Sequence, residues 1–100
     1  MNYLWEILVP TMIDDKPVRT RYHKVWDQKV REIAGGLTIL KPAKGQWVCP
    51  ESKALFSERM IPVRIACTTQ QIFDIANMTK EYYKQLKVMF YRIADEVHFI

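Results

Sequence analysis

The order of apolar and polar residues along the chain switches between the period of a strand and that of a helix. Residues 3–9 alternate, with apolar side chains on both faces, which is typical of a central strand covered on at least one side. Pro10 ends this strand, and the Asp and Pro residues that follow predict a loop over 11–17. From about residue 19 to residue 34 the period becomes helical, and a pair of glycines then supplies the usual helix stop.

Short extended segments and one long strand fill the middle of the chain. Short strands are predicted over 37–40 and 46–49, with a turn between them, and a long strand or ribbon over 54–67. The second half of the long strand alternates clearly. Pro62 interrupts it without being able to donate a ladder hydrogen bond, so we expect a bulge or an unpaired position there.

The last third of the chain predicts a helix and then a strand. Thr68 is followed three residues later by Gln71, a capping-box pattern that starts a helix. The helical period continues as far as Leu86. Residues 88–93 are predicted as the last main strand, and residues 97–100 as a short final one.

The resulting order is β-α-β-β-α-β, which predicts an α+β, ferredoxin-like fold: an antiparallel sheet with two helices on one face. A chain of 100 residues has the size of a single domain, so one domain is expected over 1–100. Such a sheet leaves its second face open. Because 49% of the residues are hydrophobic, we expect a second copy to cover that face in a homodimer or higher oligomer.

Positive charge is concentrated in one part of the chain. The formal net charge is +4, and six of the basic residues lie within 16–31 against the single acid Asp27. A basic region of this kind attracts anions, such as a nucleotide, a nucleic acid or an acidic metabolite. The alternative is an ordinary solvated helix face.

Several functional classes are not favoured by the sequence. No apolar run approaches the length of a membrane span, and the first residues lack the pattern of a signal peptide. Cys49 and Cys67 are expected to be reduced thiols, so a cytoplasmic location is predicted and a membrane partner is not. His23 and His98 lie far apart without ligands at metal-binding spacing, so neither a metal site nor a cofactor is expected.

Nucleic acid is not expected as a partner. RNA-recognition domains share the predicted topology, but they stack bases on aromatic residues of a glycine-containing strand. The corresponding strand over 58–65 has neither an aromatic residue nor a glycine.

One group of polar and aromatic residues lies on or beside the middle strands: Thr38, Trp47, Glu58 and Arg64. A carboxylate near a Trp, with arginines close by, can bind a polar ligand through charge-assisted hydrogen bonds and stacking. A structural Glu–Arg pair with a packed Trp is the alternative. In the last strand Tyr91 and Arg92 point to opposite faces, so only one of them can line a shared pocket. The full set of predicted ligand-binding residues is Arg19, Arg21, His23, Trp26, Thr38, Trp47, Glu58, Arg64 and Arg92.

A family resemblance rests on short segments that together span most of the chain. These are Trp5–Thr11, Gly35–Ile39, Gly45–Trp47, Glu58–Val63 and Tyr83–Val88. They resemble a family of small, mostly uncharacterised bacterial and phage-borne proteins with a Gly-Leu-Thr strand, a Gly-x-Trp turn and a Glu that opens the next strand. The resemblance implies a ferredoxin-like fold. The outline is also similar to dimeric α+β barrel proteins, some of which are small oxygenases or isomerases.

Two functional hypotheses follow. The first is a homo-oligomeric protein that binds a small, anionic, nucleotide-like ligand, as do phage-borne proteins that sequester nucleotide messengers. The second is a small cofactor-free enzyme in which Glu58 or His23 acts as general base, which needs a carboxylate or imidazole with a shifted pKa in an apolar pocket. A protein-binding module that uses the open sheet face is a third class.

Overall fold

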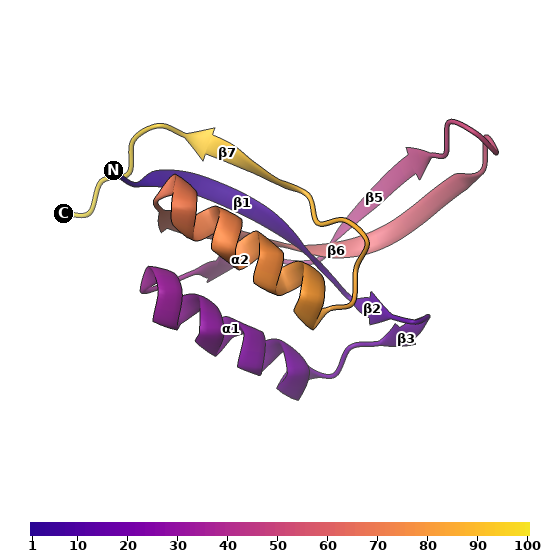
Figure 1. The fold of residues 1–100 in the computed structure, drawn as a ribbon, viewed down its shortest axis with the longest axis horizontal. Coiled ribbons are helices and arrows are strands. Elements are labelled where there is room, and N and C mark those ends of the chain that lie inside the picture. The colour runs from indigo at the N-terminus through magenta and orange to yellow at the C-terminus, as the bar shows by residue number, and fades with distance from the viewer.

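The computed structural model describes residues 1–100, and Figure 1 shows their arrangement. One antiparallel sheet carries a pair of helices, and a small hairpin projects beside them. The elements in chain order are β1 Tyr3–Pro10, β2 Met12–Ile13, β3 Lys16–Pro17, α1 Thr20–Ala34, β4 Thr38–Ile39, β5 Ala43–Val48, β6 Leu55–Cys67, α2 Thr69–Tyr82 and β7 Phe90–Ala94.

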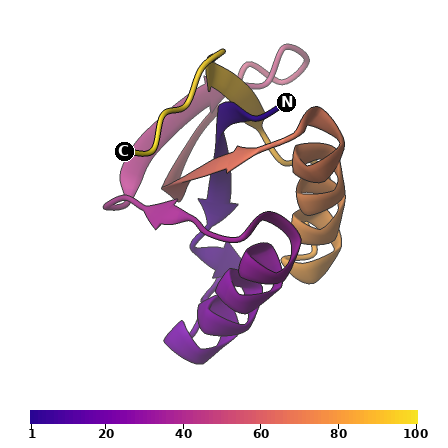
Figure 2. The same cartoon turned by 90° about the vertical axis from the view of Figure 1, so that its left-hand side faces the viewer.

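The main sheet has the order β4-β6-β1-β7, and β5 pairs with the other half of β6. All pairings are antiparallel. Figures 1 and 2 show that α1 and α2 lie on the same side of this sheet. The predicted ferredoxin-like α+β fold is therefore confirmed.

The core lies between the sheet and the helices. Alternate residues of β1 and β6 point toward the helices, and the apolar stripe of each helix packs onto them. Burying one such aliphatic side chain contributes about 1.5–3 kcal/mol. The buried residues of the core include Trp5, Ile7, Val9, Trp26, Val30, Val63, Ile65, Cys67, Ile72 and Ile75.

The predicted helix boundaries are confirmed where the sequence carries a capping signal. Gly35 follows α1 with φ +89°, a left-handed conformation that glycine adopts without strain, and its N–H bonds to the Arg31 carbonyl at 2.8 Å. Thr68 and Gln71 form the predicted capping box at the start of α2. The local sequence thus sets the C-terminal end of α1 and the N-terminal end of α2.

Pro62 behaves differently on its two sides. It pairs opposite Leu8 with no shift of register, so the expected bulge is absent from the β1 ladder. On the other side its carbonyl accepts a hydrogen bond from Leu40 N–H, and its nitrogen, which points the same way, lies where the partner of β6 changes from β4 to β5. The expected unpaired position is therefore found at this junction, where the missing N–H costs no ladder bond.

Strand ends are shifted by up to three residues, as in β5, which begins at Ala43 rather than at residue 46, and three further predictions differ more clearly. α2 ends at Tyr82 rather than Leu86, because Lys84 turns the chain with φ +54°. Residues 97–100 form no strand, since the ladder between β1 and β7 already ends at the Leu4–Ala94 pair. The predicted loop over 11–17 contains the β2–β3 hairpin, whose turn residues Asp14 and Asp15 both have positive φ.

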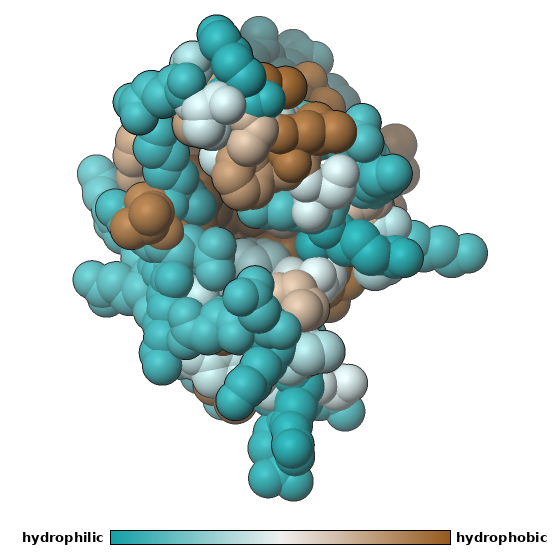
Figure 3. All heavy atoms as spheres, turned by 90° about the vertical axis from the view of Figure 1, so that its right-hand side faces the viewer, coloured by the Kyte–Doolittle hydropathy of each residue, from teal (hydrophilic) through white to brown (hydrophobic).

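The β5–β6 hairpin extends well beyond the body of the molecule (Figure 1). We call residues 43–60 the arm. Its residues are exposed or half-buried, and the radius of gyration of 14.2 Å exceeds the ~13 Å of a compact 100-residue domain. The four large apolar residues nearest its end are Trp47, Val48, Leu55 and Phe56, which are 42–64% exposed. Figure 3 shows apolar surface among hydrophilic side chains on the side of the molecule from which the arm projects.

Candidate functional site

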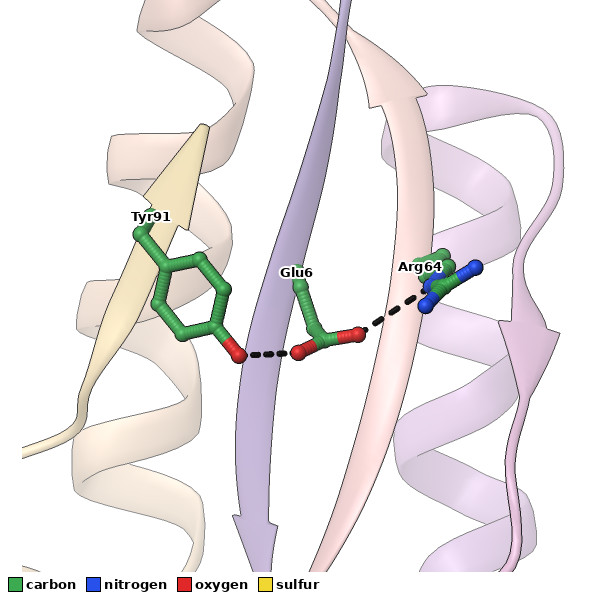
Figure 4. Close-up of polar contacts among 3 residues, drawn as sticks. All are labelled: Glu6, Arg64 and Tyr91. Carbon is green, nitrogen blue, oxygen red and sulfur yellow. Dashed lines mark hydrogen bonds and ion pairs between the residues drawn. The ribbon is translucent and has the colours of Figure 1, made fainter. Parts of the chain in front are cut away.

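The face of the sheet opposite the helices, which we call the open face, carries a charged cluster at its centre. Glu6 lies in the middle of β1, directly opposite Arg64 of β6 on one side and Tyr91 of β7 on the other. Residues directly opposite each other in adjacent strands have side chains close enough to interact. The strand register therefore brings together three residues that are distant in the sequence (Figure 4).

Both oxygens of the Glu6 carboxylate have partners. Arg64 Nε donates to Oε1 at 3.1 Å, and the Tyr91 hydroxyl donates to Oε2. The Glu6 side chain is only 11% exposed, whereas that of Arg64 is 45% exposed. A buried carboxylate is stable only when it is paired and hydrogen-bonded, and here it is both. Arg64 still presents part of its guanidinium to solvent.

Tyr91 keeps its proton more firmly than a free tyrosine does. Its hydrogen bond to Glu6 raises the pKa of the phenol, and partial burial and the Glu6 charge add to this, while Arg64 opposes it. Tyr91 is therefore a hydrogen-bond donor at neutral pH, held against a carboxylate. This arrangement can bind a polar group of a ligand by hydrogen bonds, although the raised pKa makes Tyr91 a weaker acid than a free tyrosine.

A hollow of about 460 Å³ meets the cluster at Arg64, the one member of the cluster that lines it. Its floor is made by open-face residues of β1 and β6, and its walls by the segment after α1 and by the C-terminal residues. The volume lies within the range of pockets for small organic ligands. The lining residues are Asn2, Leu4, Ala34, Gly35, Gly36, Leu37, Thr38, Arg64, Ala66, Val97 and Phe99.

The predicted group on the middle strands is split into two places. Thr38 pairs with Arg64 and lines the hollow, as the sequence suggested. Glu58 and Trp47 lie on the arm, where Glu58 is six residues from Arg64, or about 20 Å along a strand. Trp47 stacks on Phe56 with ring centroids 4.5 Å apart. One chain therefore does not bring Trp47 and Glu58 to Arg64.

Glu58 does not have the surroundings of a general base within a single chain. It is exposed, and no cation lies within ion-pair distance of its carboxylate. The hollow beside it, formed by Pro42, Lys44, Ser57 and Arg59 with Glu58 itself, has no hydrophobic lining residue. The apolar pocket that the enzyme hypothesis needs is thus not formed around Glu58 by this chain alone.

Arg92 and Tyr91 do point to opposite faces, as the period of the strand predicted. Arg92 pairs with Asp95 at 3.1 Å and lies over the Tyr3 ring at 4.6 Å. It is therefore engaged at the edge of the sheet and away from Glu6. Tyr91, which the sequence did not select as a site residue, takes the place beside Glu6 instead.

The remaining predicted residues lie on or beside α1. Arg19 and Arg21 are exposed and line a separate groove. His23 Nδ1 is 2.6 Å from the Tyr83 hydroxyl, and burial lowers the pKa of this histidine, an effect that Asp27 partly opposes. Trp26 is 1% exposed and donates to Thr79 Oγ1 at 2.9 Å, so its prediction as a ligand-binding residue is wrong: it belongs to the core.

Glu6 was missed because its neighbours along the chain are apolar. A charge inside a strand with two apolar faces is itself a signal, since a carboxylate is rarely buried without a partner. The identity of that partner depends on the register of β1 against β6 and β7, which is set by contacts far apart in the sequence. The signal was present, but its partners could not be named from it.

Comparisons with known proteins define the class of fold. No protein-family model matches the chain, and no curated protein sequence matches it either. Solved structures of ferredoxin-like α+β proteins do match over nearly the whole chain. They are too distant in sequence to show more than the fold.

Two kinds of protein are among the matching structures. The periplasmic divalent cation tolerance protein CutA of Archaeoglobus fulgidus has a TM-score of 0.71 at 11% identity, covering 99% of this chain and 88% of that one. The divalent cation tolerance protein of Thermus thermophilus has 0.67 at 12% identity, covering 97% and 88%. A phage SAM lyase in complex with S-methyl-5′-thioadenosine has 0.64 at 17% identity, covering 97% and 92%.

Two further observations bear on the classes weighed above. Neither helix is long and apolar enough to cross a membrane. No group of three or more His, Cys, Asp or Glu side chains within the chain is placed to hold a metal ion.

Proposed function

We propose that this chain assembles into a homo-oligomer that binds a small nucleoside-type ligand on its open face, at Glu6, Arg64 and Tyr91. The observation that carries the proposal is a buried carboxylate with a partner on each oxygen, whose partner Arg64 also lines a hollow of about 460 Å³ on the side of the sheet that no helix covers. Ionisable groups arranged in this way beside a hollow are typical of binding and active sites.

The ligand class follows from the groups present. Arg64 can hold a carboxylate or a ribose hydroxyl, and Glu6 with Tyr91 can hold a donor or a positive centre. S-adenosylmethionine presents all of these, with a sulfonium centre, an amino acid group and a ribose. The similarity to a phage SAM lyase supports the same class of compound. The expected ligand is therefore an adenosyl thioether or sulfonium, in place of a strongly anionic nucleotide.

Self-association is supported by the arm. Its large apolar side chains point to both faces of a two-stranded ribbon, and nothing in the same chain covers them. An isolated hairpin is marginally stable in water, so a second copy is the simplest cover. Trp47 of β5 pairs with Phe56 of β6, which shares a face with Glu58 and Arg64. An arm that reaches a neighbouring subunit can therefore present an aromatic pair and a carboxylate to the open face of that subunit.

Conversion of the ligand is the second candidate function. It is supported by the similarity in fold to a phage SAM lyase and by the pair that the Tyr91 hydroxyl forms with the Glu6 carboxylate. The test is incubation with S-adenosylmethionine, followed by mass-spectrometric measurement of S-methyl-5′-thioadenosine against a protein-free control. Product formation at the rate of the control excludes this lyase activity and leaves binding.

Thermal denaturation tests binding directly. The panel contains S-methyl-5′-thioadenosine, S-adenosylmethionine, ATP and Cu²⁺, the last because of the cation-tolerance proteins of similar fold. At ten times Kd a ligand stabilises the folded state by about 1.4 kcal/mol, which raises Tm by about 5 °C or more in a domain of this size. We expect this shift with the two adenosyl compounds in the wild type and in the control Glu81→Gln, and its loss in Glu6→Gln. A shift with Cu²⁺ alone, or none, would contradict the proposal.

A further inference from the structure

A second hollow lies on the other side of the molecule, between the β2–β3 hairpin, the start of α1 and the end of α2. It measures about 360 Å³, within the usual range for small-molecule sites. Its walls are mainly apolar, and three basic side chains lie among them. The lining residues are Ile13, Lys16, Pro17, Val18, Arg19, Arg21, Tyr22, Val25 and Tyr82, and we call this hollow the basic groove.

The basic side chains of the groove have no acidic partners. The ion pairs of the chain involve Arg64, Arg92 and His98, so no carboxylate lies within 4.0 Å of Lys16, Arg19 or Arg21. These three cations come from different parts of the segment that leads into α1. The start of α1 adds to the positive field, because its first turn has no acid and its N-cap residue supplies no side-chain cap.

The polar atoms of the groove's tyrosines are already used within the protein. The Tyr22 hydroxyl donates to the Tyr82 carbonyl, and the Tyr82 hydroxyl donates to the Tyr22 carbonyl at 2.7 Å. The two rings stack with centroids 4.1 Å apart. The rings therefore offer apolar and aromatic surface to a ligand, while recognition of its polar group falls to the lysine and the arginines.

The groove is formed before any ligand arrives. Asp14 and Asp15 close a two-residue turn with positive φ at both positions, and Val18 N–H bonds to the Thr11 carbonyl at 2.9 Å where the hairpin ends. The opposite wall is the interface of α1 and α2, which the tyrosine bonds hold together. A preformed site loses little conformational freedom when it binds.

We infer that the basic groove is a second binding site, independent of the open face, for a small organic anion with an apolar body. Charge complementarity selects the anionic group, because unpaired cations at the groove are the only ionised groups that line it. Val18, Val25 and the tyrosine rings select an apolar or aromatic body. An aryl-alkyl carboxylate has both features.

The test is an NMR titration of the intact ¹⁵N-labelled protein with 4-phenylbutyrate, and in parallel with the uncharged 4-phenylbutan-1-ol. Saturable shifts are expected at groove residues, with the alcohol at least about tenfold weaker, because tenfold corresponds to the loss of one charged contact. Arg21→Glu should weaken 4-phenylbutyrate by about tenfold or more. Lys24→Glu, an exposed change of equal charge on the same helix, should change its Kd by less than about twofold.

A second variant examines the apolar part of the site. Val25 is 43% exposed, so Val25→Asp introduces a carboxylate into the groove wall without emptying the core, and it should also abolish binding. Three results would overturn the inference: no saturable shift up to millimolar 4-phenylbutyrate, equal affinity for the acid and the alcohol, or equal weakening by Arg21→Glu and Lys24→Glu. The last would mean that the anion responds only to net charge.

Discussion

On the helix-covered face of β1, Trp5, Ile7 and Val9 are each at most 7% exposed and belong to the core. On the open face of the same strand Glu6 is almost as buried, at 9%, but it is held by Arg64 and Tyr91. The two faces differ in chemistry although alternate residues of the same strand form them. Because side chains alternate along a strand, one segment can hold the fold together on one side and present a polar site on the other.

The largest expected effect lies on the covered face. Ile7→Ala removes a fully buried side chain and should lower the free energy of unfolding by about 2–5 kcal/mol. Leu8→Ala, one residue further and on the open face, should lower it by less than half as much, because Leu8 is only half-buried. Urea denaturation measures both. Equal losses would mean that a further layer covers the open face as tightly as the helices cover the other.

The next largest effect concerns self-association through the arm, which continues the open face along β6. Trp47→Ser should weaken self-association by about 2 kcal/mol per interface, or about thirtyfold in Kd, since an exposed aromatic pair is typical of an interface hot spot. The matched control on the same strand is Lys44→Ser. Light scattering over a dilution series measures the mass. A wild type that stays monomeric at high concentration would contradict the proposed assembly.

A smaller effect is expected from a single hydroxyl on the open face. Tyr91→Phe leaves Glu6 Oε2 without its partner and removes a hydroxyl that we propose contacts the ligand, so it should weaken binding of S-methyl-5′-thioadenosine by about tenfold, the loss expected for one hydrogen bond to the ligand. Tyr3→Phe is the control, since its hydroxyl makes no hydrogen bond within the chain. Isothermal titration measures both Kd values. Equal affinities in the two variants would separate Tyr91 from the site.

The smallest effect concerns pH on the covered side. Burial lowers the pKa of His23 below its ordinary 6.5, so the unfolded chain binds this proton more tightly than the folded chain does. As the pH falls through 6.5 the unfolded state is protonated first, and the free energy of unfolding falls. His23→Gln should flatten this decrease, whereas the exposed His98→Gln should not. Urea titrations between pH 5 and 8 compare them, and equal pH profiles would rule out His23 as the cause.

Much of the fold was predictable because its signals are local. Apolar periodicity gave the main strands and helices, and Gly35 and the Thr68–Gln71 box gave helix ends that the structure confirms. The loop at Lys84 was missed, since an ordinary lysine carries no signal for positive φ. The resemblance to small bacterial and phage-borne proteins stays a prediction.

The site was less predictable because it depends on register. Thr38 and Arg64 were selected and do lie together, but Glu6 and Tyr91 are brought to them only by ladders that join residues 58 and 85 positions apart. Arg92 and Trp26 were predicted as ligand-binding residues from their residue types alone, without knowledge of which face or layer holds them. The strand period allowed either Tyr91 or Arg92 to face the site, and only the pairing of β1 with β7 decides between them.

The substitution Glu6→Leu tests the central claim most directly, when unfolding and binding of S-methyl-5′-thioadenosine are measured on the same sample. Removing one partner of a buried ion pair is costly when it leaves the other charge buried and unpaired, but the Arg64 side chain is 45% exposed and can be solvated, so this cost should be small here. We predict a free energy of unfolding within about 1 kcal/mol of the wild type, together with complete loss of binding. A loss of several kcal/mol in the free energy of unfolding would show that Glu6 serves the fold. Binding that persists unchanged would show that the ligand site does not depend on Glu6, which contradicts the proposed site on the open face.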